Sequence, residues 1–283
     1  MKGARTKWMM PWYGWVGLAM TLISVCLSWN LTGVRTHLLF FPQWMGYGFV
    51  VQALVERRTG SCFLKRKPLG YGLLFLVSIP VWWIFEGLNL FTGNWYYVGR
   101  AAFTDLEFFL FSSVSFSTVI PAVFGTAELL GTFSWTDRLR GLGSFPLRSR
   151  TLWWLHWSGW VMLLLMIIFP RVFFPFMWIS IFLILDTLNA RMGNRSLILE
   201  LSGGNVRPLV LYGLGALVCG FFWEMWNIFA YPKWVYDIPY LDGLHVFEMP
   251  LAGYGGYIPF GWELFAMCSL IRCKGSGFGL GQR

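Results

Sequence analysis

Two glutamates in this sequence lie inside long apolar segments, where a carboxyl group is costly. Glu86 and Glu224 each sit near the end of such a segment. Asn89 and Asn227 follow three positions later, which places each asparagine on the same helical face as its glutamate. An ionisable side chain within a membrane segment costs about 2.5 kcal/mol or more on insertion scales and usually marks a site or an internal pairing. We therefore expect either chemistry or a structural network here.

Two more glutamates, Glu107 and Glu248, are predicted to begin the next helices from the same side of the membrane. An acid there suits the positive end of a helix dipole. The sequence predicts that all four glutamates gather with the two asparagines and with nearby aromatic side chains in the outer half of the membrane. The aromatic members of this predicted cluster are Trp95, Tyr97, Trp234 and Tyr236.

Four interpretations of the cluster stay open. In the first, each glutamate is neutral because burial disfavours its charge, and it hydrogen-bonds an asparagine or a tryptophan and holds helices together. In the second, a neutral carboxylic acid donates a proton to an alkene, and aromatic faces stabilise the resulting cation. In the third, the Glu-x-x-Asn pattern binds a metal, although it lacks the imidazole of di-iron bundles. The fourth is ion or proton translocation.

Three further acids lie in or beside other apolar segments. Asp186 near Arg191, and Glu128 near Arg138, are expected to form ion pairs at the inner membrane interface. Glu263 lies deeper, after a glycine-rich stretch at residues 253–257 that contains Tyr254 and Tyr257. Those glycines permit either close helix packing or a wedge-shaped pocket for a flat ligand.

The composition indicates that the elements positioning these residues cross a membrane. The chain of 283 residues is 57% hydrophobic and 12% charged, and its mean hydropathy is +0.57. These values exclude a soluble, disordered or collagen-like chain, and the five cysteines, which form no CxxC pair, are interpreted as packing residues. We predict an all-α, polytopic transmembrane helix bundle with about eight helices, at residues 12–30, 37–55, 69–91, 106–131, 152–169, 172–190, 208–230 and 247–271.

The distribution of basic residues predicts the sidedness. Eighteen of the 22 Lys and Arg residues lie in the N-terminus, in the loops 56–68, 132–151 and 191–207, and in the C-terminus. The opposite side holds only Arg35, Arg100, Arg171 and Lys233. Both termini are therefore predicted to be cytoplasmic. The net charge of +9 is explained by topology and anionic headgroups, and no nucleic-acid partner is expected.

The chain also resembles itself. Residues 12–16 recur as 157–161, residues 40–44 as 173–178, residues 85–89 as 223–227, and residues 95–97 as 234–236. We predict two four-helix repeats, residues 1–131 and 153–283, joined by a basic cytoplasmic linker at 132–152. Because four is even, the repeats are parallel and related by a pseudo-twofold axis along the membrane normal. Each recurring residue then appears twice at one depth.

The pattern of an acid, a Trp-x-Tyr loop and a later Pro resembles two related carotenoid-pathway families. These are the lycopene cyclase domain of the heterodimeric bacterial and archaeal type and the carotenoid hydratase family. The resemblance covers residues 222–262, with a weaker echo at 85–109, and it implies a multi-helix architecture and a polyene or isoprenoid ligand. It departs from the cyclases at their paired glutamates after Pro-Leu, since Glu248 precedes Pro250 and Glu107 has no neighbouring proline. The whole chain also looks like a group of bacterial integral membrane proteins for which the resemblance implies no activity.

The sequence thus predicts a cofactor-independent, metal-free isoprenoid- or carotenoid-modifying enzyme of the bacterial cytoplasmic (inner) membrane. Glu86 and Glu224 are the expected general acids, Glu107 and Glu248 the base or orienting partners, with the asparagines holding their geometry. The alternative is a non-enzymatic subunit of a larger respiratory or photosynthetic membrane complex that contacts pigments, lipids or neighbouring subunits. A third hypothesis is a small transporter.

Overall fold

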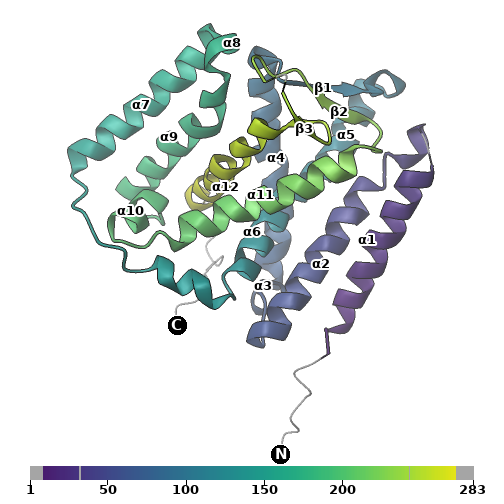
Figure 1. The fold of residues 1–283 in the computed structure, drawn as a ribbon, viewed down its shortest axis with the longest axis horizontal. Helices are drawn as coiled ribbons and strands as arrows, with labels where there is room; N and C mark the ends of the chain where they lie inside the picture. The colour runs from purple at the N-terminus through teal and green to yellow at the C-terminus, as the bar shows by residue number, and fades with distance from the viewer. Residues whose placement is uncertain (1–8, 32, 242, 272–283) are drawn as a thin grey trace, which may run out of the picture.

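The computed structural model describes residues 9–31, 33–241 and 243–271, and helices dominate it (Figure 1). Six segments are long and apolar enough to cross a membrane, so the protein is a multi-pass membrane protein. These segments are α1 (Trp12–Asn30), α4 (Pro68–Thr92), α5 with α6 (Asp105–Phe116 and Val119–Leu130), α7 (Ser149–Ile168), α8 with α9 (Pro170–Phe173 and Met177–Arg191) and α11 (Arg207–Asn227). The predicted helical membrane fold is confirmed at this level, whereas the count of eight, the duplication and the sidedness stay predictions.

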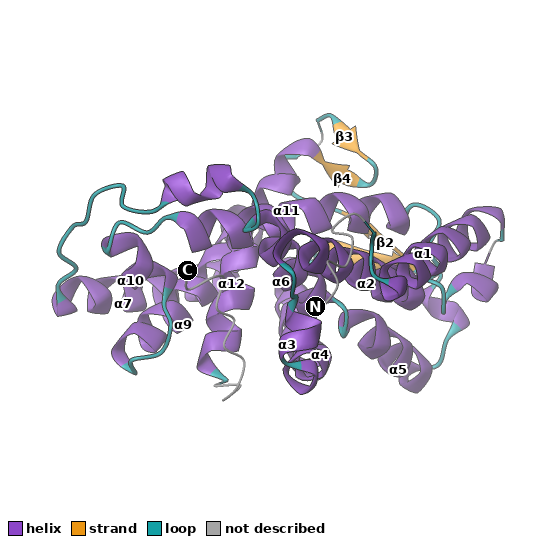
Figure 2. Ribbon diagram, turned by 90° about the horizontal axis from the view of Figure 1, so that it is seen from below, coloured by secondary structure: helices purple, strands orange, loops and turns teal. Residues whose placement is uncertain are grey.

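Other helices connect these segments or pack against them. They are η1 (Gly33–Thr36), α2 (Phe40–Thr59), α3 (Phe63–Arg66), η2 (Arg100–Ala102), η3 (Ser134–Leu139), η4 (Phe174–Phe176), α10 (Leu197–Ser202) and α12 (Tyr257–Leu270). Figures 1 and 2 agree that α7, α9 and α10 lie on one flank and α1 and α2 on the other. Helices α4, α6, α11 and α12 lie between the two flanks and form the centre of the bundle.

Close helix contacts on both flanks depend on small residues. A Cβ atom at Gly17 of α1 would lie 2.6 Å from the carbonyl oxygen of Gly46 in α2. Likewise, a Cβ atom at Gly159 of α7 would lie 2.9 Å from the carbonyl oxygen of Ser180 in α9. Association between helices in lipid relies on such close backbone approach, because lipid chains are as apolar as leucine. These glycines therefore fix the pairs α1–α2 and α7–α9.

The predicted helix at 106–131 is interrupted where α5 ends and α6 begins. Ser78 of α4 supplies the reason for the break. Its hydroxyl donates to the carbonyl oxygen of Phe116 at 2.6 Å and accepts from the backbone N–H of Ile120 at 3.1 Å. Ser78 is fully buried, so its hydroxyl replaces water in satisfying backbone groups that the interruption frees.

The predicted helix at 247–271 is wrong in its first ten residues. Residues 245–250 form the short hairpin of β3 (His245–Val246) and β4 (Met249–Pro250), followed by the turn η5 (Leu251–Gly256). Phe247 has a φ of 60°, which a helix does not accommodate. Pro250 and the glycines that follow disfavour a continuous helix, so only α12 remains, with 14 residues.

A two-stranded sheet joins the two halves of the chain. Strand β1 (Trp95–Val98) follows α4, and strand β2 (Lys233–Tyr236) follows α11. They pair antiparallel, with Trp95 opposite Tyr236 and Tyr97 opposite Trp234. The two strands that carry the predicted aromatic residues therefore lie side by side, which places both sets of side chains around one region of the protein (Figure 1).

The inner acids have other partners than those predicted. Asp186 accepts hydrogen bonds from the backbone N–H groups of Leu197 and Ile198 at 2.9 and 2.8 Å, and so caps α10. Glu128 forms an ion pair with Arg66 of α3. The predicted pairs with Arg191 and Arg138 are therefore wrong, because backbone donors at the starts of short helices are nearer than the loop arginines.

Candidate functional site

Glu86, in the last turns of α4, is surrounded by donors from its own half of the chain. Its Oε1 accepts hydrogen bonds from the hydroxyl of Tyr97 at 2.6 Å, from Nε1 of Trp82 at 2.9 Å and from Nε1 of Trp95 at 3.2 Å. Trp82 lies one turn earlier in the same helix, whereas the other two donors come from β1. The carboxyl group thus ties the end of the helix to the strand that follows.

Glu224 occupies the corresponding place in α11 and is fully buried. Its Oε1 accepts from the hydroxyls of Tyr236 and Tyr257, each at 2.6 Å. Nε1 of Trp234 in turn donates to the Tyr236 hydroxyl at 2.9 Å. Oε2 of Glu224 is buried and has no hydrogen-bond partner among the described residues. A buried carboxyl oxygen without a protein partner is costly and calls for an explanation, such as a catalytic role.

The two asparagines form hydrogen bonds to the strands and not to the glutamates. Asn227 donates to the carbonyl oxygen of Trp234 at 2.6 Å and accepts from its N–H at 2.9 Å. Asn89 makes the same two bonds to Trp95, at 2.7 and 3.2 Å. Each carboxamide therefore satisfies both backbone groups of a strand residue and fixes the aromatic side chain that follows. Their predicted role of holding the geometry of the glutamates stays a prediction, and the bonds that they make are to the backbone of Trp95 and Trp234.

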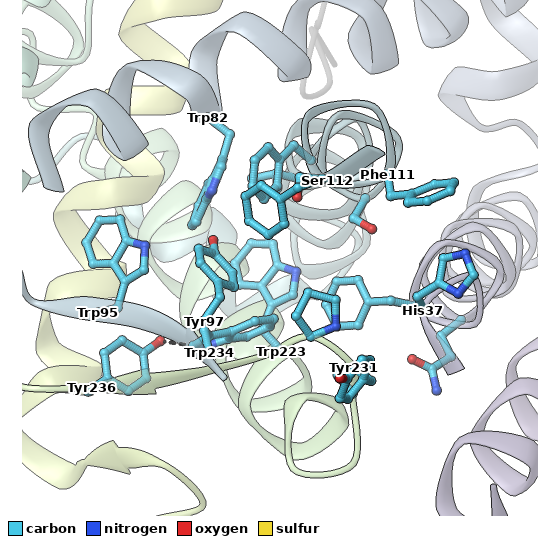
Figure 3. A pocket seen from close by; sticks show the side chains of 18 of the residues that line it. His37, Trp82, Trp95, Tyr97, Phe111, Ser112, Trp223, Tyr231, Trp234 and Tyr236 are labelled. Carbon is cyan, nitrogen blue, oxygen red and sulfur yellow. Dashed lines mark hydrogen bonds between the residues drawn. The ribbon is translucent and has the colours of Figure 1, made fainter. Parts of the chain in front are cut away.

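A cavity of about 130 Å³ lies beside these residues. Figure 3 shows Trp82 and Tyr97 pointing toward each other on one side of it, and His37 and Tyr231 on the other. Glu86 and Glu224 do not line the cavity, but their hydroxyl donors Tyr97, Tyr236 and Tyr257 do. The wall is mostly aromatic, and includes Phe40, Trp82, Trp95, Phe108, Phe116, Trp178, Trp223 and Trp234, with Ser112, Ser115, Gly253 and Gly256 as its small members.

The other two predicted glutamates, Glu107 and Glu248, have local partners of their own. Glu107 is exposed at the start of α5, where it forms a capping box with Thr104. Glu248 lies in the turn between β3 and β4, and its Oε1 is 2.5 Å from Nζ of Lys233. Within the described part of the chain, no hydrogen bond joins any two of the four glutamates. Local partners bind Glu107 and Glu248, although Glu248 lies near enough to Glu224 for the two carboxyl groups to interact electrostatically. The predicted joint role of the four glutamates stays a prediction.

The tyrosines on the strands remain hydroxyl donors. Burial raises the pKa of Tyr97 and of Tyr236 well above the ordinary tyrosine value, and the neighbouring glutamate raises it further. Both side chains are therefore neutral at physiological pH and can donate. Each side chain lines the cavity and bonds a glutamate through its hydroxyl, so a proton can be exchanged between carboxyl group and cavity across one side chain.

Sequence reasoning missed Tyr257 and the glycine that accommodates it. A Cβ atom at Gly220 would lie only 2.3 Å from Cδ2 of Tyr257, so α11 needs a glycine there for the ring to reach Glu224. The glycine-rich stretch before α12 was the available signal. Gly253, Gly256 and Tyr257 all line the cavity, in accord with the pocket interpretation of that stretch rather than with packing alone.

Comparisons with known proteins add no family. None of the protein-family models, curated proteins or solved structures that were compared with the chain matches it. The resemblance to the two carotenoid-pathway families therefore stays a prediction. Among the described residues, no group of three or more His, Cys, Asp or Glu side chains is placed to hold a metal ion.

Proposed function

We propose that this membrane protein binds an apolar ligand of the polyene or isoprenoid class in the aromatic cavity and acts on it by proton transfer. The observation that carries the proposal is the wall of the cavity, which includes three tyrosines whose hydroxyls are hydrogen-bonded to the half-buried Glu86 or to the buried Glu224. Ligand sites are commonly apolar hollows with a few convergent polar groups. The cavity has this composition.

The ligand class follows from the lining. The walls offer indole and phenyl faces, which favour a flat, unsaturated hydrocarbon and stabilise positive charge that develops on it. Among the described residues that line the cavity there is no lysine or arginine, which is the composition expected of a site for an uncharged ligand. A hydrocarbon of the isoprenoid class meets both conditions.

The proposal also uses the duplication predicted from the sequence. Residues 95 and 97 are the predicted counterparts of 234 and 236, and each pairs with the counterpart of the other across β1 and β2. Such a register is what a twofold axis between two related strands produces. The identical bonds of Asn89 and Asn227 to the following tryptophans support the same relation. The proposed axis passes beside the cavity, so both glutamates contribute to one site.

The proposed reaction begins with protonation of a carbon–carbon double bond. The Tyr257 hydroxyl gives its proton to the alkene and takes one from the Glu224 carboxyl, and the cation that forms lies against the faces of Trp82 and Trp223. Loss of a proton from a neighbouring carbon back to the same pair closes the cycle, so the double bond has moved or a ring has formed without any cofactor. Transfer by a positioned acid of this kind contributes about 10²–10⁴-fold to a rate.

The binding step can be tested with all-trans-retinol as an isoprenoid polyene probe. Energy transfer from protein tryptophan to retinol should rise saturably in detergent-solubilised protein. Ser115→Leu fills the cavity and should abolish the saturable part. Ser158→Leu is the matched control, because Ser158 of α7 lies outside the cavity and donates only to the carbonyl oxygen of Leu155 at 2.8 Å. Equal saturable transfer in both variants would remove the cavity as the site.

The alternative of a non-enzymatic complex subunit predicts a different result. A subunit of that kind needs partner proteins or pigments over its outer helices and has no requirement for an empty cavity. Purification of a colourless, self-sufficient protein that binds retinol would count against it, whereas copurification with a pigmented complex and no retinol binding would support it.

A further inference from the structure

A second hollow lies on the outside of the bundle, away from the aromatic cavity. This groove, about 560 Å³ in volume, runs between α2 and α4 and ends against α5. Its walls are almost wholly apolar, and comprise Phe41, Met45, Phe49, Leu64, Pro68, Tyr71, Gly72, Phe75, Leu76, Ile79, Val114 and Ser117.

The groove faces the surroundings of the protein rather than its core. Leu76, on the groove wall, is 63% exposed. Leu73, three residues earlier in the same helix, is also exposed. Because α4 crosses the membrane, an opening on this helix meets lipid and not water. Gly72 contributes to the opening, since a Cβ atom there would meet nothing within 4 Å.

One end of the groove is basic. Leu64 and Pro68 form that end, and the three residues between them in the chain are Lys65, Arg66 and Lys67. Lys65 is paired with Glu56 of α2, and Arg66 with Glu128 of α6.

The positive charge of this end comes mainly from two other basic residues, Lys67 and Arg57. Arg57 lies in the last turn of α2, together with Arg58. Neither Lys67 nor Arg57 makes an ion pair with any described residue. The basic side chains at this end thus outnumber the acidic ones by four to two, and the end of the groove carries a net positive charge. They are Arg57, Lys65, Arg66 and Lys67 against Glu56 and Glu128.

We infer that this groove is a binding site for one anionic phospholipid, whose acyl chain lies between α2 and α4 and whose phosphate lies at the Lys67 end. Basic clusters at the ends of transmembrane helices attract anionic headgroups, and clefts between helices accommodate lipid tails. The apolar length and the charged end occur together on one opening, which neither a soluble anion nor a neutral lipid would require. The inference is independent of the proposed function, since none of the groove residues lines the aromatic cavity.

Two variants test separately how the acyl chain and the headgroup of the lipid contribute to binding. Gly72→Leu projects a side chain into the groove, and its control is Gly87→Leu on the same helix, where a Cβ atom also meets nothing within 4 Å. Arg57→Gln with Lys67→Gln removes the unpaired charges, and its control is Arg148→Gln with Arg150→Gln in the linker before and at the start of α7. Correct folding is checked by the melting temperature.

The measurement is native mass spectrometry of the full chain, released from detergent containing phosphatidylglycerol or phosphatidylcholine with identical acyl chains. Wild type and both controls should retain one phosphatidylglycerol at least about tenfold more than phosphatidylcholine. Gly72→Leu should lose retention of phosphatidylglycerol, and the double charge variant should bind the two lipids equally. Equal retention of both lipids by the wild type, or undiminished phosphatidylglycerol in Gly72→Leu, would overturn the inference.

Discussion

Substitution of Gly220 by alanine tests whether Tyr257 must lie against α11 to reach Glu224. The new Cβ atom would lie 2.3 Å from Cδ2 and 2.5 Å from Cε2 of the Tyr257 ring, whereas ordinary contact begins near 3.4 Å. The ring must therefore move by about 1.1 Å, the difference between 3.4 and 2.3 Å. A shift of that size away from Glu224 lengthens the bond from 2.6 Å to about 3.7 Å, which no longer counts as a hydrogen bond.

The expected cost combines two effects. Overpacking costs about 1–3 kcal/mol, and the lost hydrogen bond adds about 0.5–1.5 kcal/mol. Thermal unfolding in detergent should therefore show a lower melting temperature for Gly220→Ala. Gly87→Ala is the control, because open space surrounds Gly87 and alanine favours a helix by about 0.5–1 kcal/mol over glycine.

A second substitution identifies the ring as the cause. Tyr257→Leu removes both the clash and the hydroxyl, so Gly220→Ala in the Tyr257→Leu background should cost much less than it does alone. Retinol binding should weaken in Gly220→Ala, since the displaced ring lines the cavity. The reasoning is refuted if Gly220→Ala melts at or above the wild-type temperature, as Gly87→Ala should.

Five further substitutions test other parts of the site and of the fold. Asn227→Ala and Asn89→Ala should each lower the free energy of unfolding by about 1–3 kcal/mol, because each frees two backbone groups of a strand tryptophan; thermal melts measure this, and unchanged melting would show that the strands hold themselves. Ser78→Ala should cost a similar amount, since a buried hydroxyl bridges the break between α5 and α6, and hydrogen exchange at residues 116–120 should speed up if the account is right. Glu224→Gln should lower conversion of a polyene in membranes by at least about 10²-fold while the protein stays inserted, and Tyr257→Phe should do the same without loss of retinol binding; unaltered product yield by chromatography in either variant contradicts the proposed proton path.

The parts of the site that could be predicted from sequence are the ones fixed by a single helix. Glu86 and Asn89 lie on one face because they are three residues apart, and the same spacing places Glu224 and Asn227. Their position inside apolar segments accounts for the full burial of Glu224 and Asn227 and the partial burial of Glu86 and Asn89. The pattern identified these positions, but the partner that each side chain binds depends on a strand formed later in the chain.

The positions that the sequence misplaced are those decided between elements. Glu107 has the sequence of a capping glutamate, three residues after Thr104, and a local cap competes successfully with any distant site. Glu248 follows Phe247, whose backbone turns the chain into a hairpin, so this acid never enters a helix. Tyr257 could not be assigned to Glu224, because 33 residues and a hairpin separate them.

The two halves differ at the point where chemistry is proposed, and the difference identifies the glutamate of greater interest. If residues 85–89 correspond to 223–227, Trp82 corresponds to Gly220, and the first half supplies an indole donor where the second half supplies empty space. Tyr257 from α12 fills that space and bonds Glu224. Glu86 consequently has three donors on one oxygen, from its own helix and the next strand. Glu224 has two tyrosine donors from separate elements and one oxygen with no partner among the described residues. A proton can leave or reach Glu224 through either of two hydroxyls on the cavity wall. Only one of the three donors to Glu86, Tyr97, can relay a proton, because the other two are indoles without an acceptor lone pair. Glu224 should therefore carry the reaction, and Glu86 should hold the strand that completes the wall.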